Sequence, residues 1–105
     1  MTVLSHADYR QGQQFHADVV VVGTGAGGAV VGAELAEAGH DVVLVEEGGY
    51  HPTSSFNPYL TESIPRLYRD AGGTIIVGRP PIPYAEGRCV GGGTVVNGGM
   101  TWRPP

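Results

Sequence analysis

The sequence contains a single cysteine, few basic residues and no apolar run of membrane-spanning length. Cys89 alone cannot form an internal disulfide, and such cysteine usage fits a reducing compartment. Lys and Arg together number 6 against 10 Asp and Glu, which leaves no basic surface for a nucleic-acid backbone. The stretch from Met1 to Ala17 lacks the basic and apolar regions of a signal peptide. We therefore expect a soluble, cytoplasmic protein with no membrane span and no nucleic-acid partner.

Glycine is abundant instead, with 18 among 105 residues, and most of it lies in two clusters. Hydrophobic residues make up 41% of the chain, which argues against intrinsic disorder. The length is that of one modest domain. The two glycine clusters carry most of the functional information, whereas oligomeric state leaves no signal in this sequence.

The first cluster follows Val19–Val22, an unbroken β-branched run that predicts a strand buried on both faces of a parallel sheet. Gly23, Gly25 and Gly28 then form G-x-G-x-x-G where the strand should become a helix over about Ala26–Ala38. The first glycine permits a tight turn, the second lets the backbone approach a pyrophosphate, and the third allows close packing of helix and strand. Free N–H groups at the helix start favour phosphate.

The segment after this helix completes a βαβ unit. Gly39 stands where a left-handed C-terminal cap is expected, and Val42–Val45 reads as a second buried strand. Glu46 ends that strand, where a carboxylate can accept hydrogen bonds from ribose hydroxyls. Glu47 should point to the opposite face, and we prefer Glu46. The pattern favours dinucleotide binding over glycines used only for packing, and it leaves FAD and NAD both open.

The remaining segments are less regular. Residues 1–17 are expected to form an extended leader that pairs at a sheet edge. In the segment that follows the βαβ unit, Pro65 limits helix formation to a short helix over 66–71. Two β-rich runs, 74–77 and 82–85, flank a Gly-Arg-Pro-Pro break and predict a short hairpin.

No metal site is expected. His6 and His16 have no cysteine or carboxylate cluster at ligand spacing, so we interpret them as solvated. Tyr50, Tyr59 and Tyr68 are interpreted as covering the sheet edge and loops, in preference to facing a substrate.

The second cluster lies within Glu86–Arg103, and it places five glycines between Gly91 and Gly99. Glycine loses the most conformational freedom on folding, so such a run suits a backbone that approaches an anion or a flat ring closely. Thr94 offers a hydroxyl donor or a cap for a helix beginning at Val95. Asn97 both donates and accepts, which suits the edge of a heterocycle. A flexible glycine loop explains the composition equally well.

Together the two clusters resemble the glucose–methanol–choline (GMC) flavoprotein oxidoreductases. Asp18–Gly28 is similar to the first FAD signature of that family, and Val43–Gly48 looks like its strand-end acid followed by glycine. Gly87–Met100 is similar to the second signature, G-R-x-x-G-G-[SG]-[ST]-x-x-N-G. Within the family, the sequence most resembles the long-chain alcohol and cholesterol oxidase type, which favours glycine at the position of Gly93.

The resemblance implies FAD as cofactor and oxidation of an alcohol, in which a base takes the hydroxyl proton while hydride passes to the flavin. The first glycines would approach the pyrophosphate, and Glu46 would hold the adenosine ribose. The second cluster would lie along the pyrophosphate-to-flavin half. The residues expected to bind FAD are Gly23, Thr24, Gly25, Ala26, Gly27, Gly28, Glu46, Val90, Gly91, Thr94, Asn97, Gly98, Gly99 and Met100.

The resemblance assigns no catalytic residue. The base of the family is a histidine near the C-terminus of a much longer chain, and none of His6, His16, His40 and His51 matches it. We therefore expect an inactive N-terminal fragment of an FAD-dependent alcohol oxidoreductase, whose small-molecule alcohol is not specified. The alternative is a non-catalytic nucleotide-binding or interaction module.

The expected fold class is α/β, an incomplete Rossmann-like FAD-binding βαβ unit followed by a loop-rich segment with a short hairpin. The expected organisation is a leader (1–17), the βαβ unit (18–49), a connecting segment (50–86) and the second glycine-rich segment (87–105).

Overall fold

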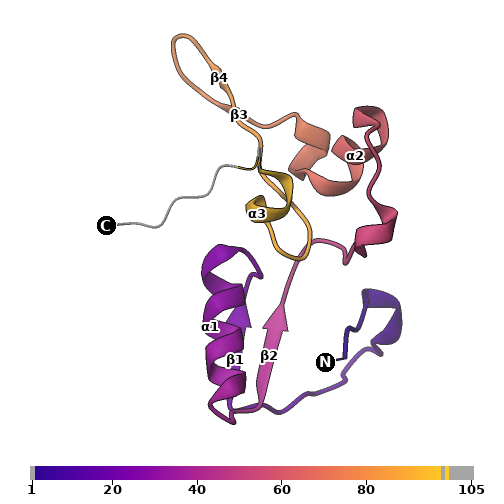
Figure 1. The fold of residues 1–105 in the computed structure, drawn as a ribbon, viewed down its shortest axis with the longest axis vertical. Helices are drawn as coiled ribbons and strands as arrows, with labels where there is room; N and C mark the ends of the chain where they lie inside the picture. Colours follow the sequence, from indigo (N-terminus) through magenta and orange to yellow (C-terminus); the bar gives the residue numbers. More distant parts are fainter. Residues whose placement is uncertain (1, 98, 100–105) are drawn as a thin grey trace.

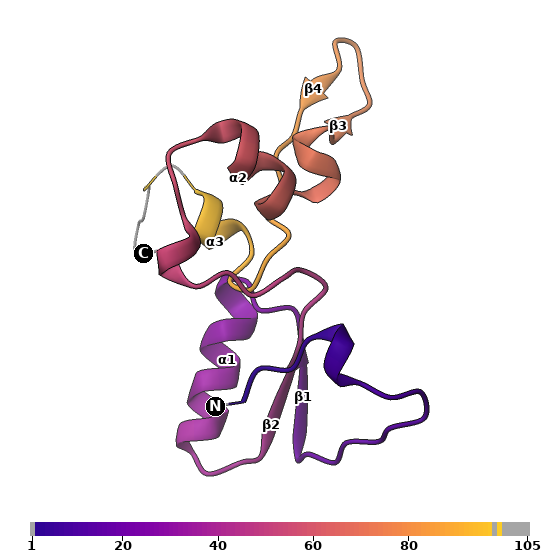
Figure 2. The same ribbon diagram turned by 90° about the vertical axis from the view of Figure 1, so that its right-hand side faces the viewer.

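The computed structural model describes residues 2–97 and residue 99. Figures 1 and 2 show a βαβ unit at one end of the molecule and an irregular part above it that contains α2, the hairpin and α3. The helices are α1 (Ala26–Glu37), α2 (Leu60–Leu67) and α3 (Gly93–Val96), with 3₁₀ turns η1 (His6–Asp8), η2 (Thr53–Ser55) and η3 (Arg69–Gly72). The strands are β1 (Val19–Val22), β2 (Val42–Val45), β3 (Ile75–Ile76) and β4 (Ile82–Pro83).

Strands β1 and β2 form a parallel pair that is joined through α1. Val19 pairs with Val42 at one end, and Val22 pairs with Val45 at the other. Gly39 follows α1 with φ +94°, the left-handed conformation expected of a helix cap. Both strands have the predicted bounds, and α1 ends one residue before the predicted limit. The α/β class and the βαβ unit are thus confirmed.

Helix α1 packs on the sheet through its small residues. A β-carbon built on Gly28 would lie 2.0 Å from the carbonyl oxygen of Gly23. One built on Gly32, which is buried, would lie 3.0 Å from the Leu44 side chain. Only residues without a side chain allow this approach, so the packing role predicted for Gly28 is confirmed.

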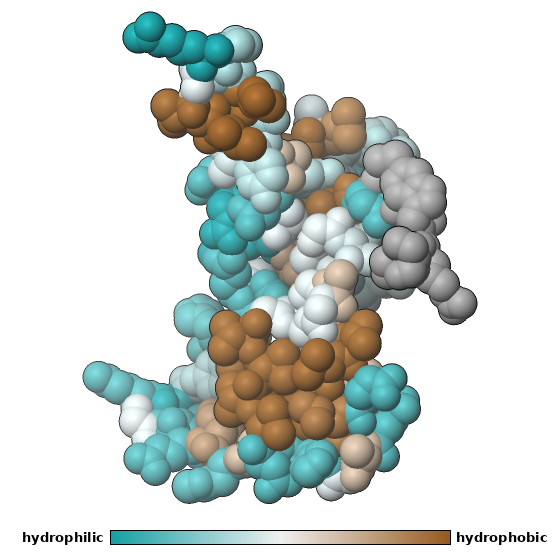
Figure 3. All heavy atoms as spheres, turned by 90° about the vertical axis from the view of Figure 1, so that its left-hand side faces the viewer, coloured by the Kyte–Doolittle hydropathy of each residue, from teal (hydrophilic) through white to brown (hydrophobic). Residues whose placement is uncertain are grey.

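The prediction that β1 is buried on both faces is wrong, and so is the prediction that β2 is buried, since Leu44 and Val45 at its end are exposed. Exposure alternates along β1, and Val20 and Val22 keep 59% and 85% of their surface accessible. The reason is that α1 covers one face of the sheet, while no described helix packs on the other. Figure 3 shows the apolar side chains gathered over the part of the molecule where the βαβ unit lies.

The leader does not pair with the sheet as expected. No strand is assigned among residues 2–17, which contain η1 and a T-shaped contact between the rings of Tyr9 and Phe15 at 5.7 Å. Within the described residues, the first backbone hydrogen bond from this end of the chain to β2 and its preceding turn is made by Asp18, just after the leader. Its amide donates to the carbonyl of Asp41 at 2.9 Å.

The helix predicted over 66–71 is also wrong. Helix α2 runs through Pro65 and ends at Leu67. One proline removes a single intrahelical hydrogen bond, which a short helix tolerates when its apolar side is anchored, and Leu67 is only 7% exposed. Asp70 and Ala71 have positive φ angles of 48° and 51°, so a regular helix cannot continue there. The predicted hairpin is present but short, since β3 and β4 pair over two residues each.

Candidate functional site

The two glycine clusters come together in the structure. The amide of Gly91 donates to Thr24 Oγ1 at 2.9 Å, although 67 positions separate the two residues. A β-carbon on Gly92 would lie 3.1 Å from the Cα of Gly25, so the two backbones nearly touch. This approach, together with the positive φ of 56° at Gly92, explains why a side chain is absent there.

The carboxylate of Glu46 lies at the junction between the clusters. Its Oε2 accepts from the backbone N–H of Thr24 at 2.9 Å and from the Thr24 hydroxyl at 2.7 Å. Its Oε1 accepts from the N–H of Gly48 at 2.9 Å. Burial raises the pKa of Glu46, but the hydrogen bonds from Gly48, Thr24 and Glu47 outweigh it and hold the pKa below its usual range. Glu46 is therefore an anion at neutral pH.

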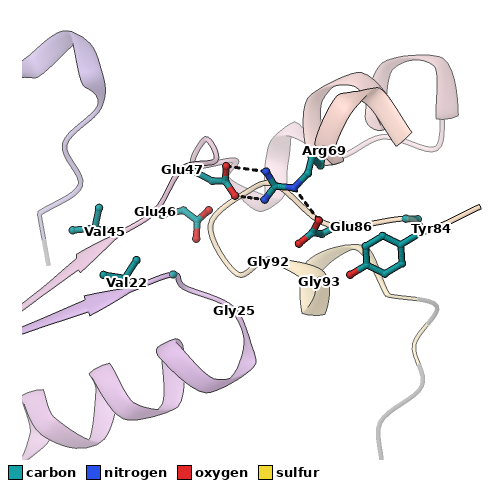
Figure 4. A pocket seen from close by; sticks show the side chains of 13 residues that line it. Val22, Gly25, Val45, Glu46, Glu47, Arg69, Tyr84, Glu86, Gly92 and Gly93 are labelled. Atoms are coloured by element: carbon teal, nitrogen blue, oxygen red, sulfur yellow. Dashed lines mark hydrogen bonds and ion pairs between the residues drawn. The ribbon is translucent and has the colours of Figure 1, made fainter. Parts of the chain in front are cut away.

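Glu47 lines the same cavity as Glu46 but has different partners. It forms an ion pair with Arg69, and Arg88 Nε lies 3.6 Å from Glu47 Oε2. Arg69 Nε also pairs with Glu86 at 2.8 Å, so one guanidinium joins the end of β2 to the segment before the second cluster (Figure 4). The hydrogen bond from Arg69 lowers the pKa of Glu47. These carboxylates raise the pKa of Arg69.

Sequence reasoning missed Arg69. The only available signal was that Glu47, next to another carboxylate, needs a cationic partner, and nothing in the local pattern selects one arginine over another. The backbone adds to this link, because the amide of Arg69 donates to Glu86 at 2.9 Å and that of Arg88 donates to Leu67 at 2.7 Å. The segment before the second cluster is thus held by both main chain and side chain.

A cavity of about 630 Å³ opens at the carboxyl ends of β1 and β2. This is the edge at which parallel α/β sheets bind ligands, and the volume is typical of a small-molecule site. Figure 4 shows the Glu46 carboxylate facing the loop that carries Gly92. The cavity is lined by Val22, Gly23, Gly25, Val45, Glu46, Glu47, Arg69, Tyr84, Ala85, Glu86, Gly87, Gly92 and Gly93.

A second cavity of about 380 Å³ lies between the start of α1 and α3. Gly25 lines both cavities, so the two spaces meet at the first glycine turn. The smaller cavity is mostly apolar, and it adjoins the free N–H groups at the start of α1. It is lined by Thr24, Gly25, Ala26, Ala29, Val30, Gly91, Thr94 and Val95.

Seven of the fourteen predicted site residues line the two cavities. Gly23 turns the chain with φ +89°, and Gly25 precedes α1 with open space beside its Cα. Gly27 and Gly28 lie in α1 and line neither cavity. The amide of Val90 donates to the Gly49 carbonyl at 3.0 Å, which places the second segment beside the end of β2.

The end of the second segment differs from expectation. Helix α3 begins at Gly93, so Thr94 lies inside the helix and does not cap it, because Gly92 takes the capping position with φ 56°. Asn97 is exposed, lines neither cavity, and accepts from the amide of Gly99 at 2.6 Å. Gly98 and Met100 lie outside the described residues.

The tyrosines differ in their surroundings. Tyr50 and Tyr59 are exposed, whereas the hydroxyl of Tyr68 donates to the carbonyl of Val96, the last residue of α3, at 3.3 Å.

Over residues 2–97 and 99 there is no group of three or more potential metal ligands. Within the same residues no helix is long and apolar enough to cross a bilayer.

Comparison with known proteins identifies the unit around the first cluster. A family described as an FAD binding domain matches residues 18–56. A GMC-type oxidoreductase of Sinorhizobium fredii is 50% identical over 90 residues, which cover 86% of this chain. A GMC-type oxidoreductase of Mycobacterium tuberculosis is 49% identical over 89 residues, or 84% of this chain. A long-chain-alcohol oxidase of Arabidopsis thaliana is 38% identical over 88 residues, again 84% of this chain.

These relatives are much longer than the chain. The matched parts make up 18%, 14% and 12% of their respective lengths. The match to the FAD binding domain decides between the two cofactors that the first cluster left open, in favour of FAD.

Proposed function

We propose that this chain, a homologue of the GMC-type oxidoreductases with an FAD-binding domain, forms the cofactor-binding part of an enzyme that oxidises the CH–OH group of an alcohol. Support for the substrate class comes from the long-chain-alcohol oxidases among the relatives. Bound FAD would supply the hydride acceptor, and this chain would bind and orient it. The observation that carries the proposal is the hydrogen bond from Gly91 to Thr24, which joins the two clusters.

The residues of the two cavities fit the two chemical halves of such a cofactor. Glu46 is an anionic acceptor in the larger cavity, and ribose hydroxyls are donors. The larger cavity also contains Glu47 and Glu86, so it suits an uncharged sugar and base better than phosphates. The open backbone at Gly25, next to the start of α1, suits the pyrophosphate.

Phosphates would therefore lie where the glycine segments meet, and the flavin half would extend toward the second segment. We propose that the predicted binding residues that line the two cavities border this path, and that Gly28 instead serves the packing of α1 on the sheet. The division of the chain into segments that end at residues 17, 49 and 86 also stays a prediction.

No catalytic base is proposed within the described residues. His6, His16, His40 and His51 line neither cavity. His51 instead lies beside α2, where its Nδ1 is 3.4 Å from the Arg66 guanidinium. We propose that the base is supplied from outside this chain, so that the chain by itself does not turn over an alcohol.

The test uses the protein that contains this chain, purified and then denatured to release bound flavin. We expect about one FAD per chain, and loss of most of it in Glu46→Ala, because the ribose loses its acceptor. Glu37→Ala, which removes an exposed carboxylate from α1, is the matched control and should retain FAD. A long-chain primary alcohol should then bleach the flavin absorbance of the holoprotein. Release of NAD instead of FAD, or retention of no nucleotide, would refute the proposal.

A further inference from the structure

Thr24 has a position unlike that of any other described polar side chain. Among the described residues, Thr24 is the only polar one that is buried, with 8% of its surface accessible. Its hydroxyl lies 2.7 Å from Glu46 Oε2 and 2.9 Å from the amide nitrogen of Gly91. One small side chain therefore contacts both the acid that ends β2 and the second glycine segment.

The proton positions in this group follow from its chemistry. The backbone N–H of Gly91 can only donate, so Thr24 Oγ1 accepts there. The single hydroxyl proton is then directed to Glu46 Oε2, which also accepts from the backbone amide of Thr24. Two donors on one oxygen suit an ionised carboxylate, in agreement with the lowered pKa of Glu46.

These contacts also leave Glu46 with capacity for a ligand. A carboxylate offers about four acceptor sites. Three donors lie within hydrogen-bond distance, two from Thr24 and one from Gly48, and the backbone N–H of Glu47 also acts on the carboxylate. The side chain nevertheless lines the larger cavity, so a ligand there can reach its oxygens.

We infer that Thr24 is a positioning residue that orients the Glu46 carboxylate for the ribose and couples it to the second glycine segment through Gly91. This inference rests on the proposed function, since it concerns the same FAD site. Its consequence is that both halves of the cofactor depend on one hydroxyl that need not touch the cofactor itself. Adenosine recognition and the position of the Gly91 amide should therefore change together.

Two variants of Thr24 separate this role from simple packing. Thr24→Val keeps the branched shape but removes the donor to Glu46 and the acceptor for Gly91. Thr24→Ser keeps the hydroxyl but removes a methyl group. Thr53→Val makes the same change at an exposed position in η2 and serves as the control for the substitution itself.

The first measurement is retention of FAD by the protein that contains this chain as the pH is lowered. Binding through an ionised Glu46 is present above the pKa of that group and is lost as the pH falls through it. Thr24→Val should raise that pKa, so the midpoint of acid-induced FAD loss should move to higher pH. Thr24→Ser and Thr53→Val should both keep the midpoint of the unmodified protein. Uniformly weaker binding in Thr24→Val with an unmoved midpoint would overturn the inference.

The second measurement does not require FAD. Hydrogen exchange at the amide of Gly91 in the ligand-free protein should become about tenfold faster in Thr24→Val, because its acceptor is gone. Thr24→Ser should restore slow exchange. An exchange rate that is equal in Thr24→Val and the unmodified protein would overturn the inference. If the protein retains no FAD while Gly91 exchange responds as expected, the coupling stands and the proposed function fails.

Discussion

The backbone of Cys89 passes directly against Gly48. A β-carbon on Gly48 would lie 2.3 Å from the Cys89 nitrogen and 2.5 Å from the carbonyl oxygen of Arg88. The next residue, Gly49, forms an isolated parallel bridge with Cys89. The second glycine segment therefore continues alongside the end of β2, and this contact requires a residue without a side chain.

Gly48→Ala should destabilise the protein. The inserted methyl group meets backbone atoms that cannot rotate away, so the second segment has to move, at a cost of about 1–3 kcal/mol. Urea denaturation, which gives the free energy of unfolding of each variant, measures this loss of stability. Gly93→Ala in the second segment is the control, because a β-carbon there meets nothing within 4 Å, and we expect a change within about 0.5 kcal/mol. Equal stability of the two variants would contradict the observed contact.

Gly28→Ala and its neighbour Gly27→Ala should change stability in opposite directions. The β-carbon at Gly28 would lie 2.0 Å from the Gly23 carbonyl oxygen, so helix α1 must move off the sheet, and we expect a loss of about 1–3 kcal/mol. At Gly27 the added methyl group meets nothing within 4 Å, and alanine favours the helix by up to about 1 kcal/mol. Thermal unfolding followed by far-UV circular dichroism distinguishes the two. A loss in Gly27→Ala as large as that in Gly28→Ala would show that the packing is misplaced.

Arg69→Met should loosen the segment that leads into the second cluster. The methionine keeps the apolar stem but removes the ion pairs to Glu47 and Glu86. We expect severalfold faster hydrogen exchange at the amides of Arg69 and Arg88, which bond across this contact. The difference should shrink at high salt, because these charges are partly exposed and therefore screened. Arg69→Lys should recover part of the protection, and a difference that is insensitive to salt would rule out the ion pairs as its cause.

Stability should fall as the pH drops below the ordinary pKa of glutamate, about 4.3. Glu46 and Glu47 both have lowered pKa values in the folded protein, so the unfolded chain binds more protons in this range. Their contribution is complete above the ordinary glutamate pKa of about 4.3 and is lost as the pH falls through the lower folded values. Glu46→Gln should flatten the acid side of a plot of unfolding free energy against pH. Glu37→Gln, at an exposed position, should leave it unchanged, and an unchanged slope in Glu46→Gln would contradict the assignment.

Cys89 should be inert toward thiol reagents until the protein unfolds. It is 1% exposed, and burial raises the pKa of its thiol, with a further increase from the negative charge of Glu46. Labelling with a disulfide reagent at neutral pH should be slow and should rise with urea along the unfolding curve. An added thiol in Ser54→Cys, at an exposed position, provides the rate of a free thiol. Rapid labelling of Cys89 in the native protein would contradict its burial.

The bounds of β1 and β2 and most of α1 were predictable from the sequence because each is specified by short-range patterns. Val19–Val22 is a β-branched run, Gly23 takes the positive φ of a tight turn, and Gly39 takes that of a helix cap. The resemblance of both clusters to the GMC family was confirmed for the same reason, since the signatures are local strings of residues.

Only the tertiary structure decided which distant groups meet. The hydroxyl of Thr24 between Glu46 and Gly91, and the guanidinium of Arg69 between Glu47 and Glu86, depend on the path of residues 50–86. That path has little periodicity to read, and it is fixed by contacts between backbones rather than by local preference. The continuation of α2 through Pro65 and the one-sided cover of the sheet likewise depend on what packs against each element, which no local pattern records.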